Sequence, residues 1–107
     1  MPKHLPDLGR FSDPVLLILS SLAGGPKHGY AMMEDILHFS GTHLEPGTLY
    51  GAIGRLEQRG WIEPLQAQDR RRPYRITTIG ATALQEQLAT MSRIVSVGQQ
   101  RIHTASH

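Results

Sequence analysis

Residues 45–60 read EPGTLYGAIGRLEQRG, and they carry the clearest helix signals in the chain. Proline is tolerated in the first turn of a helix, and glycine is typical of the left-handed position just after a helix ends. The pattern therefore predicts a helix that begins at Pro46, runs to Arg59 and is capped by Gly60.

The two faces of this predicted helix differ in bulk. Leu49, Ile53 and Leu56 recur at helical spacing on one face and form a core stripe. The opposite face has few side chains, although each interior glycine lowers the stability of a helix by about 1 kcal/mol relative to alanine. We therefore expect something to approach this bare face closely. The residues of this face and its flanks are Gly47, Thr48, Tyr50, Gly51, Gly54, Arg55 and Gln58.

Two more helices are predicted upstream of this one. The Ser-Asp-Pro of residues 12–14 supplies a capping side chain and a first-turn proline, and the helix it opens ends at the Gly-Gly-Pro of residues 24–26. A second helix is predicted from about Pro26 to Ser40 and is ended by Gly41. Residues 1–11 contain prolines and a glycine without periodicity, so we expect an N-terminal arm there.

A β-hairpin with a basic tip is predicted downstream. Residues 61–65 and 74–77 read as short strands, and the polar segment between them joins them. Residues 66–77 contain four arginines against Asp69 alone, a local charge of +3 that exceeds the net charge of +2 for the whole chain. Pro73 has no N–H for the strand ladder, so we expect it to shorten or stiffen the hairpin.

The last predicted helix starts near Thr78 and runs to about Thr104. Its apolar positions follow coiled-coil spacing over about three heptads, and Gly98 occupies the missing heptad place. Gly98 predicts a kink or a frayed end. A single apolar stripe would be exposed to solvent in a monomer, so we expect it to pack on a second copy of the chain. The expected dimerisation residues are Leu84, Leu88, Met91, Val95 and Ile102.

Composition excludes several classes of protein. The 107 residues suit one small domain, and 39% of them are hydrophobic. With no cysteine, the chain has no disulfide scaffold, thiolate metal site or catalytic cysteine. The longest apolar run, residues 15–19, is far short of the roughly 20 residues of a membrane span, so we expect no membrane partner. His38 and His43 lack the spacing of a helical metal site, and no catalytic motif is present, so we expect no metal, no cofactor and no enzymatic activity.

The order of elements predicts a mainly α fold with a small β-hairpin, an α+β arrangement known as the winged helix-turn-helix. In this fold the third helix enters the major groove of DNA, which is wide enough for a helix. The tip of the hairpin, the wing, lies along the neighbouring backbone, where arginines meet phosphates or the minor groove. The predicted organisation is an arm at 1–11, a DNA-binding domain at 12–77, and a dimerisation helix and tail at 78–107.

Several motifs together resemble the PadR family of bacterial transcriptional regulators. The resemblance covers roughly residues 14–82, and the single C-terminal helix is similar to the smaller members of that family. It implies a homodimer that binds an operator in double-stranded DNA, usually as a repressor, and is released by an effector. The motifs are PKHGY at 26–30, PGTLY at 46–50, RLE at 55–57, GWI at 60–62 and the stretch 72–80.

The resemblance also implies which residues contact DNA. The segment at the start of the third helix reads the bases, Tyr30 matches a backbone-contacting position, and the wing arginines meet phosphates. The chain departs from the family pattern at Gly51, Gly54 and Pro73. The full set of expected DNA contacts is Tyr30, Gly47, Thr48, Tyr50, Gly51, Arg55, Gln58, Arg70, Arg71, Arg72 and Tyr74.

Four aromatic or imidazole residues have two interpretations each. His28 either starts a helix beside Tyr30 or contacts a phosphate, and Tyr30 itself either packs or contacts a phosphate. Tyr50 either contacts DNA or packs under the first helix. Trp61 is expected in the core, with ligand stacking as its other role.

The function predicted from the sequence is that of a dimeric repressor in the bacterial cytoplasm, associated with the nucleoid when bound to DNA. A small hydrophobic effector at the dimer interface is a further expected partner, although the last helix has no aromatic residue to stack on it. Two alternatives remain at this stage. One is a winged helix that docks another protein, and the other is a small-molecule sensor whose DNA binding is secondary.

Overall fold

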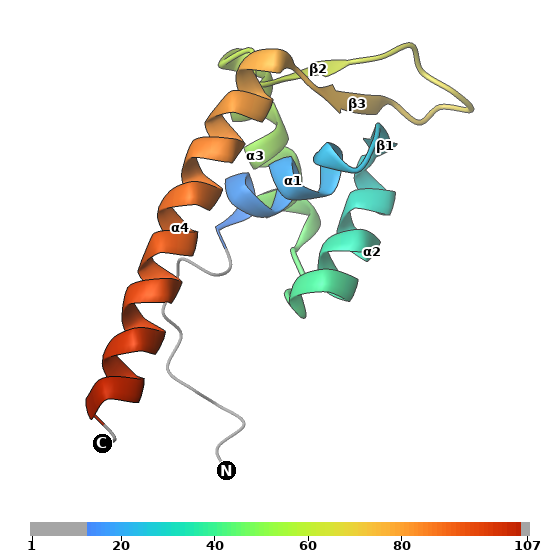
Figure 1. Cartoon of the computed structure of the whole chain (residues 1–107). Coiled ribbons are helices and arrows are strands. Elements are labelled where there is room, and N and C mark those ends of the chain that lie inside the picture. Colours follow the sequence, from blue (N-terminus) through green and yellow to red (C-terminus); the bar gives the residue numbers. More distant parts are fainter. Residues whose placement is uncertain (1–12, 106–107) are drawn as a thin grey trace.

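Four helices and three short strands follow one another in the computed structural model, which describes residues 13–105 (Figure 1). The predicted N-terminal arm at 1–11 lies outside the described residues. The elements are α1 (Pro14–Ala23), β1 (Lys27–His28), α2 (Gly29–Ser40), α3 (Pro46–Gln58), β2 (Ile62–Pro64), β3 (Pro73–Ile76) and α4 (Thr78–Ala105).

The helix ends lie where the capping residues predicted them. Asp13 accepts a hydrogen bond from the Val15 amide at 3.0 Å and caps the start of α1. Gly41 ends α2 with a left-handed backbone, φ 76°, and Gly60 follows α3 with φ 75°. These conformations are easy for glycine and strained for other residues, so local sequence was sufficient to set these boundaries.

One apolar core joins α1, α2 and α3, which together with the three strands form the head of the molecule. The predicted stripe of α3 is confirmed, because Leu49, Ile53 and Leu56 are all buried. They pack with residues of α1 and α2, and with Ile62 of β2. Trp61, which was expected in the core, lies partly buried against it, and the Arg59 guanidinium lies over its ring at 5.2 Å from the ring centre.

The hairpin is confirmed, and a third strand adds to it. The strand order is β1-β3-β2, with both pairs antiparallel. The prediction that α2 begins near Pro26 was wrong by about three residues, because Lys27 and His28 pair with Tyr74 and Pro73 of β3. The short strand therefore attaches the start of α2 to the base of the wing.

Lys27 fastens β1 to the end of α1. Its ammonium donates to the Ser21 carbonyl at 2.5 Å and to the Gly25 carbonyl at 3.2 Å, carbonyls at the C-terminal end of α1. The Ser21 hydroxyl donates to the Asp35 carboxylate at 2.7 Å, and that carboxylate lies 3.9 Å from the ammonium. This network holds β1, and with it His28, in a defined place against α1 and α2.

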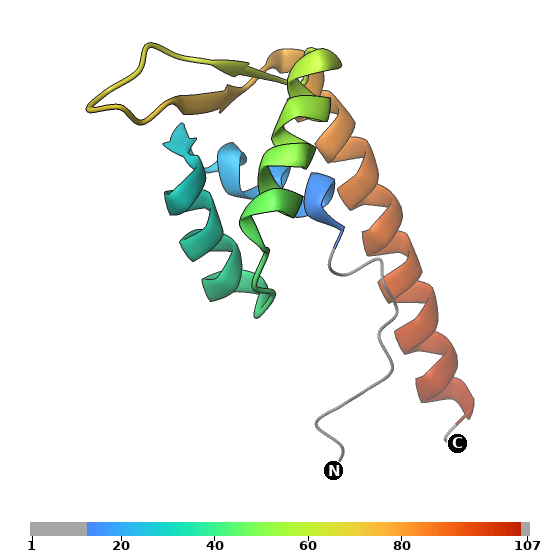
Figure 2. The ribbon, with the colours of Figure 1, turned by 180° about the vertical axis from the view of Figure 1, so that it is seen from behind.

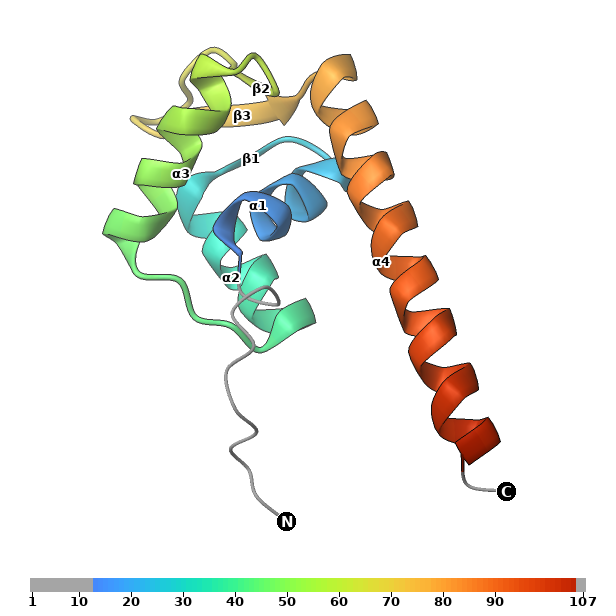
Figure 3. The ribbon, with the colours of Figure 1, turned by 90° about the vertical axis from the view of Figure 1, so that its left-hand side faces the viewer.

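The long helix α4 is continuous from Thr78 to Ala105. Of the two outcomes predicted for Gly98, a kink or a frayed end, the frayed end was wrong, since the helix continues through that residue. Figures 1 and 3 show α4 running along the head and then beyond it, so that its C-terminal turns stand clear of α1, α2 and α3. The whole is a winged helix followed by a long C-terminal helix, as the sequence predicted.

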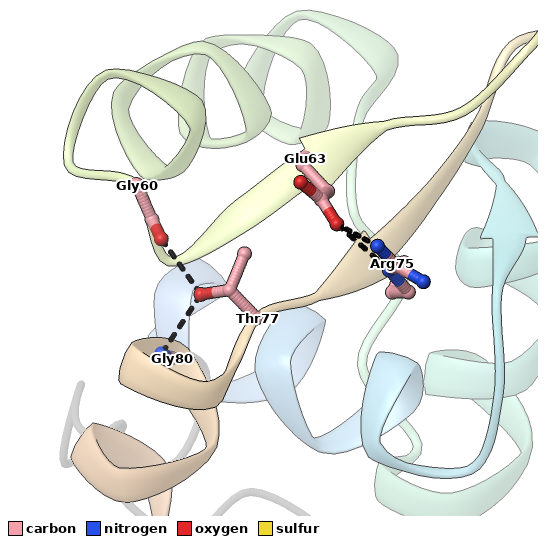
Figure 4. Close-up of polar contacts among 5 residues, drawn as sticks. All are labelled: Gly60, Glu63, Arg75, Thr77 and Gly80. Atoms are coloured by element: carbon pink, nitrogen blue, oxygen red, sulfur yellow. Dashed lines mark hydrogen bonds and ion pairs between the residues drawn. The ribbon is translucent and has the colours of Figure 1, made fainter.

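Thr77 and Gly80 join α4 to the head (Figure 4). The Thr77 hydroxyl donates to the Gly60 carbonyl at 2.7 Å and accepts from the Gly80 amide at 3.1 Å. The Thr77 amide donates to the Trp61 carbonyl at 2.9 Å. Gly80 is buried so close to this carbonyl that a Cβ on it would lie 2.0 Å from the oxygen. The absence of a side chain at Gly80 is therefore what lets α4 start here.

Candidate nucleic-acid interface

The bare face of α3 is exposed, as the sequence predicted. Every candidate contact on this helix is exposed, whereas its leucines and isoleucine are buried. A Cβ added at Gly47 or Gly54 would meet nothing within 4 Å, and one at Gly51 would meet only the Arg55 side chain at 3.6 Å. A ligand can therefore approach the backbone of α3 more closely here than over any larger residue. The exposed candidates of α3 are Gly47, Thr48, Tyr50, Gly51, Arg55 and Gln58.

The tip of the wing is a two-residue turn. Asp69 and Arg70 both have positive φ, 49° and 67°, which is the pattern of a type I′ hairpin turn. Gln68 and Arg71 on either side exchange backbone hydrogen bonds of 2.7 and 2.8 Å. Figure 2 shows the hairpin extending well beyond the helices, with α3 in front of the head. The turn thus holds Arg70 at the far end of a narrow, exposed ribbon.

Arg72 was expected only as part of the positive charge of the wing, but it also stabilises the hairpin. The Leu65 amide donates to the Pro73 carbonyl at 2.8 Å, but Pro73 has no N–H to return the bond. The Arg72 guanidinium donates to the Leu65 carbonyl at 2.7 Å instead. One of the five N–H groups of Arg72 therefore replaces the missing strand donor, and the others remain for a ligand.

The hairpin is less basic than the sequence count suggested. Glu63 of β2 lies opposite Arg75 of β3, and the Arg75 Nε atom donates to the Glu63 carboxylate at 2.8 Å (Figure 4). A second guanidinium nitrogen of Arg75 contacts the same carboxylate oxygen. The local charge of +3 overlooked Glu63, which lies just outside the counted segment. The basic character belongs to Arg70, Arg71 and Arg72 at the tip.

A cavity of about 250 Å³ lies where the wing, α2 and α3 meet. Six of the predicted DNA contacts line it, from three separate elements of the fold. Tyr30 and Tyr50 line it while remaining more than half exposed, at 58% and 53%. The lining residues are His28, Gly29, Tyr30, Tyr50, Arg70, Arg71, Arg72 and Tyr74.

Tyr50 lies across the start of α2. A Cβ added to Gly29 would lie 2.3 Å from the Tyr50 hydroxyl oxygen, so the glycine makes room for the phenol. Of its two sequence interpretations, the packing one placed Tyr50 under the first helix, and this placement was wrong. The side chain packs on α2 instead and keeps its outer half exposed, so it is still available to a ligand.

Tyr74 offers a neutral hydroxyl to the cavity. Burial raises its pKa above the ordinary value, and the charge of Glu57 raises it further, while Arg72 opposes both effects. Because the pKa is raised from a value already near 10, the hydroxyl keeps its proton at neutral pH. Tyr74 can therefore donate a hydrogen bond to an acceptor in the cavity.

His28 and Gly29 are the two cavity residues that the predicted set of contacts left out, and of these His28 has the polar side chain. Its Nδ1 atom accepts from the Ala31 amide at 3.3 Å and caps α2, which confirms its place at a helix start. Its Nε2 atom lies 3.2 Å from the Arg71 guanidinium. The sequence offered one signal for this site, a side chain with two ring nitrogens at a helix start, but the partner on the wing is 43 residues away.

The apolar stripe of α4 divides between the head and the surface. Leu84 is only 5% exposed and belongs to the core, so it has almost no surface left for a second copy, contrary to its predicted place in a dimer interface. Met91 is partly buried. Leu88, Val95 and Ile102 are exposed, and Ile102 reaches 71%. No helix among residues 13–105 has the length and apolar character needed to cross a membrane.

Comparisons with known proteins give consistent matches. Residues 18–86 match the transcriptional regulator PadR-like family. A relative described as an uncharacterised 37.1 kDa protein in transposon TN4556 of Streptomyces fradiae is 41% identical over 85 residues. That alignment covers 79% of this chain but only 25% of the relative, so this chain spans about a quarter of that protein's length.

Two solved structures have a similar fold. A transcriptional regulator from Clostridium thermocellum is 28% identical, with a TM-score of 0.71 over 81% of this chain and 87% of that chain. A PadR family transcription regulator from Clostridium difficile is 24% identical, with a TM-score of 0.75 over 83% of this chain and 97% of that chain, and at this identity it shows the fold alone. Every residue that lines the cavity lies within the matched residues 18–86.

Proposed function

The chain belongs to the PadR-like family of transcriptional regulators, and on this premise we propose that it is a homodimeric repressor that binds a specific DNA sequence. One observation carries the proposal. Candidate DNA contacts from α2, α3 and the wing, remote in sequence, converge on one exposed cavity edged by three arginines. A surface of this shape and charge suits the negatively charged backbone of a DNA duplex.

We assign different tasks to α3 and the wing. The exposed face of α3 enters the major groove, where Thr48, Tyr50, Arg55 and Gln58 reach the base edges. The glycines of that face let the helix approach closely. The wing arginines and Tyr30 contact phosphates, which supplies affinity for any sequence and fixes the position of α3 on the duplex.

The exposed part of the α4 stripe supports the homodimer. Leu88, Val95 and Ile102 lie on the same helix face as Leu84, which packs on the head, and they continue that face beyond it. We propose that a second copy covers them. A two-fold dimer carries two recognition helices, and one turn of DNA separates their sites by about 34 Å, so the expected operator is an inverted repeat.

Release of the operator completes the proposal. A change in the angle between the two heads of the dimer would move one recognition helix out of its groove, and an effector that favours the other angle would lower DNA affinity by population shift. A small hydrophobic molecule at the dimer interface is the proposed effector. We expect the protein to act in the bacterial cytoplasm, on DNA of the nucleoid.

Fluorescence anisotropy of labelled duplexes tests the proposal. The probe duplex carries the region upstream of this chain's own coding sequence, and a scrambled duplex of the same composition is the control, each at about 50 and 200 mM salt. We expect a preference of about 10³-fold or more for the upstream duplex, with affinity falling steeply as salt rises. Absence of binding to either duplex at low salt would overturn the proposal in favour of a winged helix that docks a protein.

The variants Arg71→Ala and Thr48→Ala should fail in different ways. Arg71 neutralises a phosphate, so its loss should weaken binding to every sequence and reduce the slope of log affinity against log salt by about 1. Thr48 contacts a base, so its loss should change which sequence is preferred and leave the slope unchanged. Anisotropy over a salt series with a panel of duplexes separates the two effects. An altered sequence preference in Arg71→Ala with an unchanged slope would contradict the role given to the wing.

A further inference from the structure

The ring of His28 makes two contacts that a neutral imidazole cannot both accept. Its Nδ1 atom is 3.3 Å from the Ala31 amide, and its Nε2 atom is 3.2 Å from the Arg71 guanidinium. An amide N–H and a guanidinium are both donors, whereas a neutral imidazole has one accepting nitrogen and one N–H. Only one of the two contacts is therefore a hydrogen bond.

The helix cap decides which nitrogen accepts. The Ala31 amide belongs to the first turn of α2, where it has no partner within the helix. When Nδ1 accepts from this amide, Nε2 carries the proton. The Nε2–H group and the Arg71 guanidinium then face each other as two donors 3.2 Å apart.

The surroundings offer these two donors no acidic partner. None of the residues that line the cavity is acidic, and within residues 13–105 the ion pairs join Lys27 to Asp35, His43 to Glu45 and Arg75 to Glu63. More donors surround the same space. Tyr30 and Tyr74 line it, and the N-terminus of α2 at Gly29 adds its partial positive charge. The lining is thus rich in donors and contains no acidic side chain, and Glu57, whose charge acts on Tyr74, is not part of it.

We propose that this cavity binds one phosphate group, with an oxygen seated between the Arg71 guanidinium and the Nε2–H of His28. The oxygen would accept from both and turn a donor–donor contact into two charge-assisted hydrogen bonds. A tetrahedral phosphate also presents oxygens in several directions, which suits donors that come from α2, β3 and the wing. In the DNA complex the phosphate belongs to the duplex backbone, and to that extent the inference rests on the proposed function.

The phosphate couples two elements that otherwise contact DNA independently. Arg71 is on the wing, and His28 caps the start of α2 and is the last residue of β1, which pairs with β3. A phosphate held by Arg71 and His28 fixes the wing relative to α2, and therefore relative to α3, which shares the apolar core with α2. The wing then adopts one register on the backbone when α3 is in the groove.

Nuclear magnetic resonance of the imidazole nitrogens tests the first step. Long-range proton–nitrogen spectra of the full chain should show His28 as the Nε2–H tautomer. Added inorganic phosphate should then shift the Nε2 resonance of His28 and the guanidinium resonances of Arg71 to saturation, while chloride at equal ionic strength should not. The Nδ1–H tautomer would overturn the inference, because Nε2 could then accept from Arg71 directly and no anion would be needed.

Matched variants separate this site from general positive charge. His28→Ser removes the ring but keeps a good capping side chain for α2, so the fold is retained. His28→Ser and Arg71→Ala should each abolish the saturable response to phosphate, whereas Arg93→Ala removes an equal charge from α4, outside the residues that line the cavity, and should keep it. A response lost equally in Arg93→Ala would overturn the inference, since the phosphate would then sense only net charge.

A double-mutant cycle on DNA affinity identifies the source of the phosphate. If one backbone phosphate bridges His28 and Arg71, His28→Ser and Arg71→Ala should each weaken DNA binding about 10-fold. The double variant should then bind DNA little worse than either single variant. Losses that multiply would overturn a shared phosphate. If the parent protein binds no DNA at all, the proposed function fails separately. The titration with inorganic phosphate then decides this site, with a free phosphate compound as its ligand.

Discussion

A Val95→Asp variant is expected to sediment as a monomer and to bind the upstream duplex about 10²- to 10⁴-fold more weakly than the parent. Two linked heads bind two half-sites with the gain of an effective concentration, and separated heads lose that gain although every DNA contact is retained. The aspartate prevents association because a carboxylate buried in an apolar interface without a partner is costly. Sedimentation equilibrium and anisotropy measure the two effects in the same samples.

Val95 is the most informative position for this test because of its place on α4. It is 53% exposed, so the substitution removes no core contact of the head. It lies near the middle of the stripe from Leu84 to Ile102, which spans about 27 Å at 1.5 Å per residue. A charge here is too far from either end of the stripe to reach solvent once a second copy covers it.

Ser96→Asp is the matched control. Ser96 is the neighbouring residue, is exposed, and is turned by about 100° around the helix from Val95. The substitution adds the same charge to the same turn of α4, so changes in net charge and helix propensity are nearly equal. It should leave both the dimer and the DNA affinity within about twofold of the parent. A Val95→Asp protein that remains dimeric would place the interface elsewhere.

Local signals explain why the helices could be predicted and one strand could not. The capping residue Asp13 and the glycines at 41 and 60 act within a few residues of the boundaries they set. β1 has only two residues, Lys27 and His28, without alternating hydrophobicity, and it exists because β3 pairs with it. A strand of this kind is defined by tertiary contacts and leaves no periodic pattern to detect.

The candidate site was predicted as a set of residues but not as a geometry. The exposed face of α3 follows from helical periodicity, because Leu49 and Leu56 fix which side is buried. The cavity depends on contacts across long stretches of chain, such as the approach of Arg71 to His28. The pairing of Glu63 with Arg75 similarly requires the strand register, which composition does not contain.

Heptad spacing in α4 also could not distinguish two kinds of partner. A stripe that packs on the same chain and a stripe that packs on a second copy have the same period. Leu84 and Val95 share this period, yet the first is buried against the head and the second is exposed. The two residues differ in burial because α4 is long: its first turns pack on the head, and its later turns extend beyond it.

Gly80→Ala is expected to destabilise the protein by about 2 kcal/mol or more, although alanine is the better helix former. The helix propensity of alanine favours the variant by about 1 kcal/mol. Against this, the new Cβ would lie 2.0 Å from the Trp61 carbonyl oxygen, which is backbone and is fixed by its hydrogen bond from the Thr77 amide. Forcing a methyl group into such a packed site typically costs 1–3 kcal/mol, and a contact with immobile backbone belongs at or above the top of that range.

Gly54→Ala isolates the clash from the general effect of losing a glycine. Gly54 is also helical, and a Cβ there would meet nothing within 4 Å, so this variant should be stabilised by about 0.5–1 kcal/mol. Both substitutions reduce the freedom of the unfolded chain equally, and their difference therefore reports the contact at Trp61. Urea unfolding followed by circular dichroism at one protein concentration measures both. Equal stability of the two variants would mean that α4 does not start against the Trp61 carbonyl, and this joint would then not set the angle between α4 and the head.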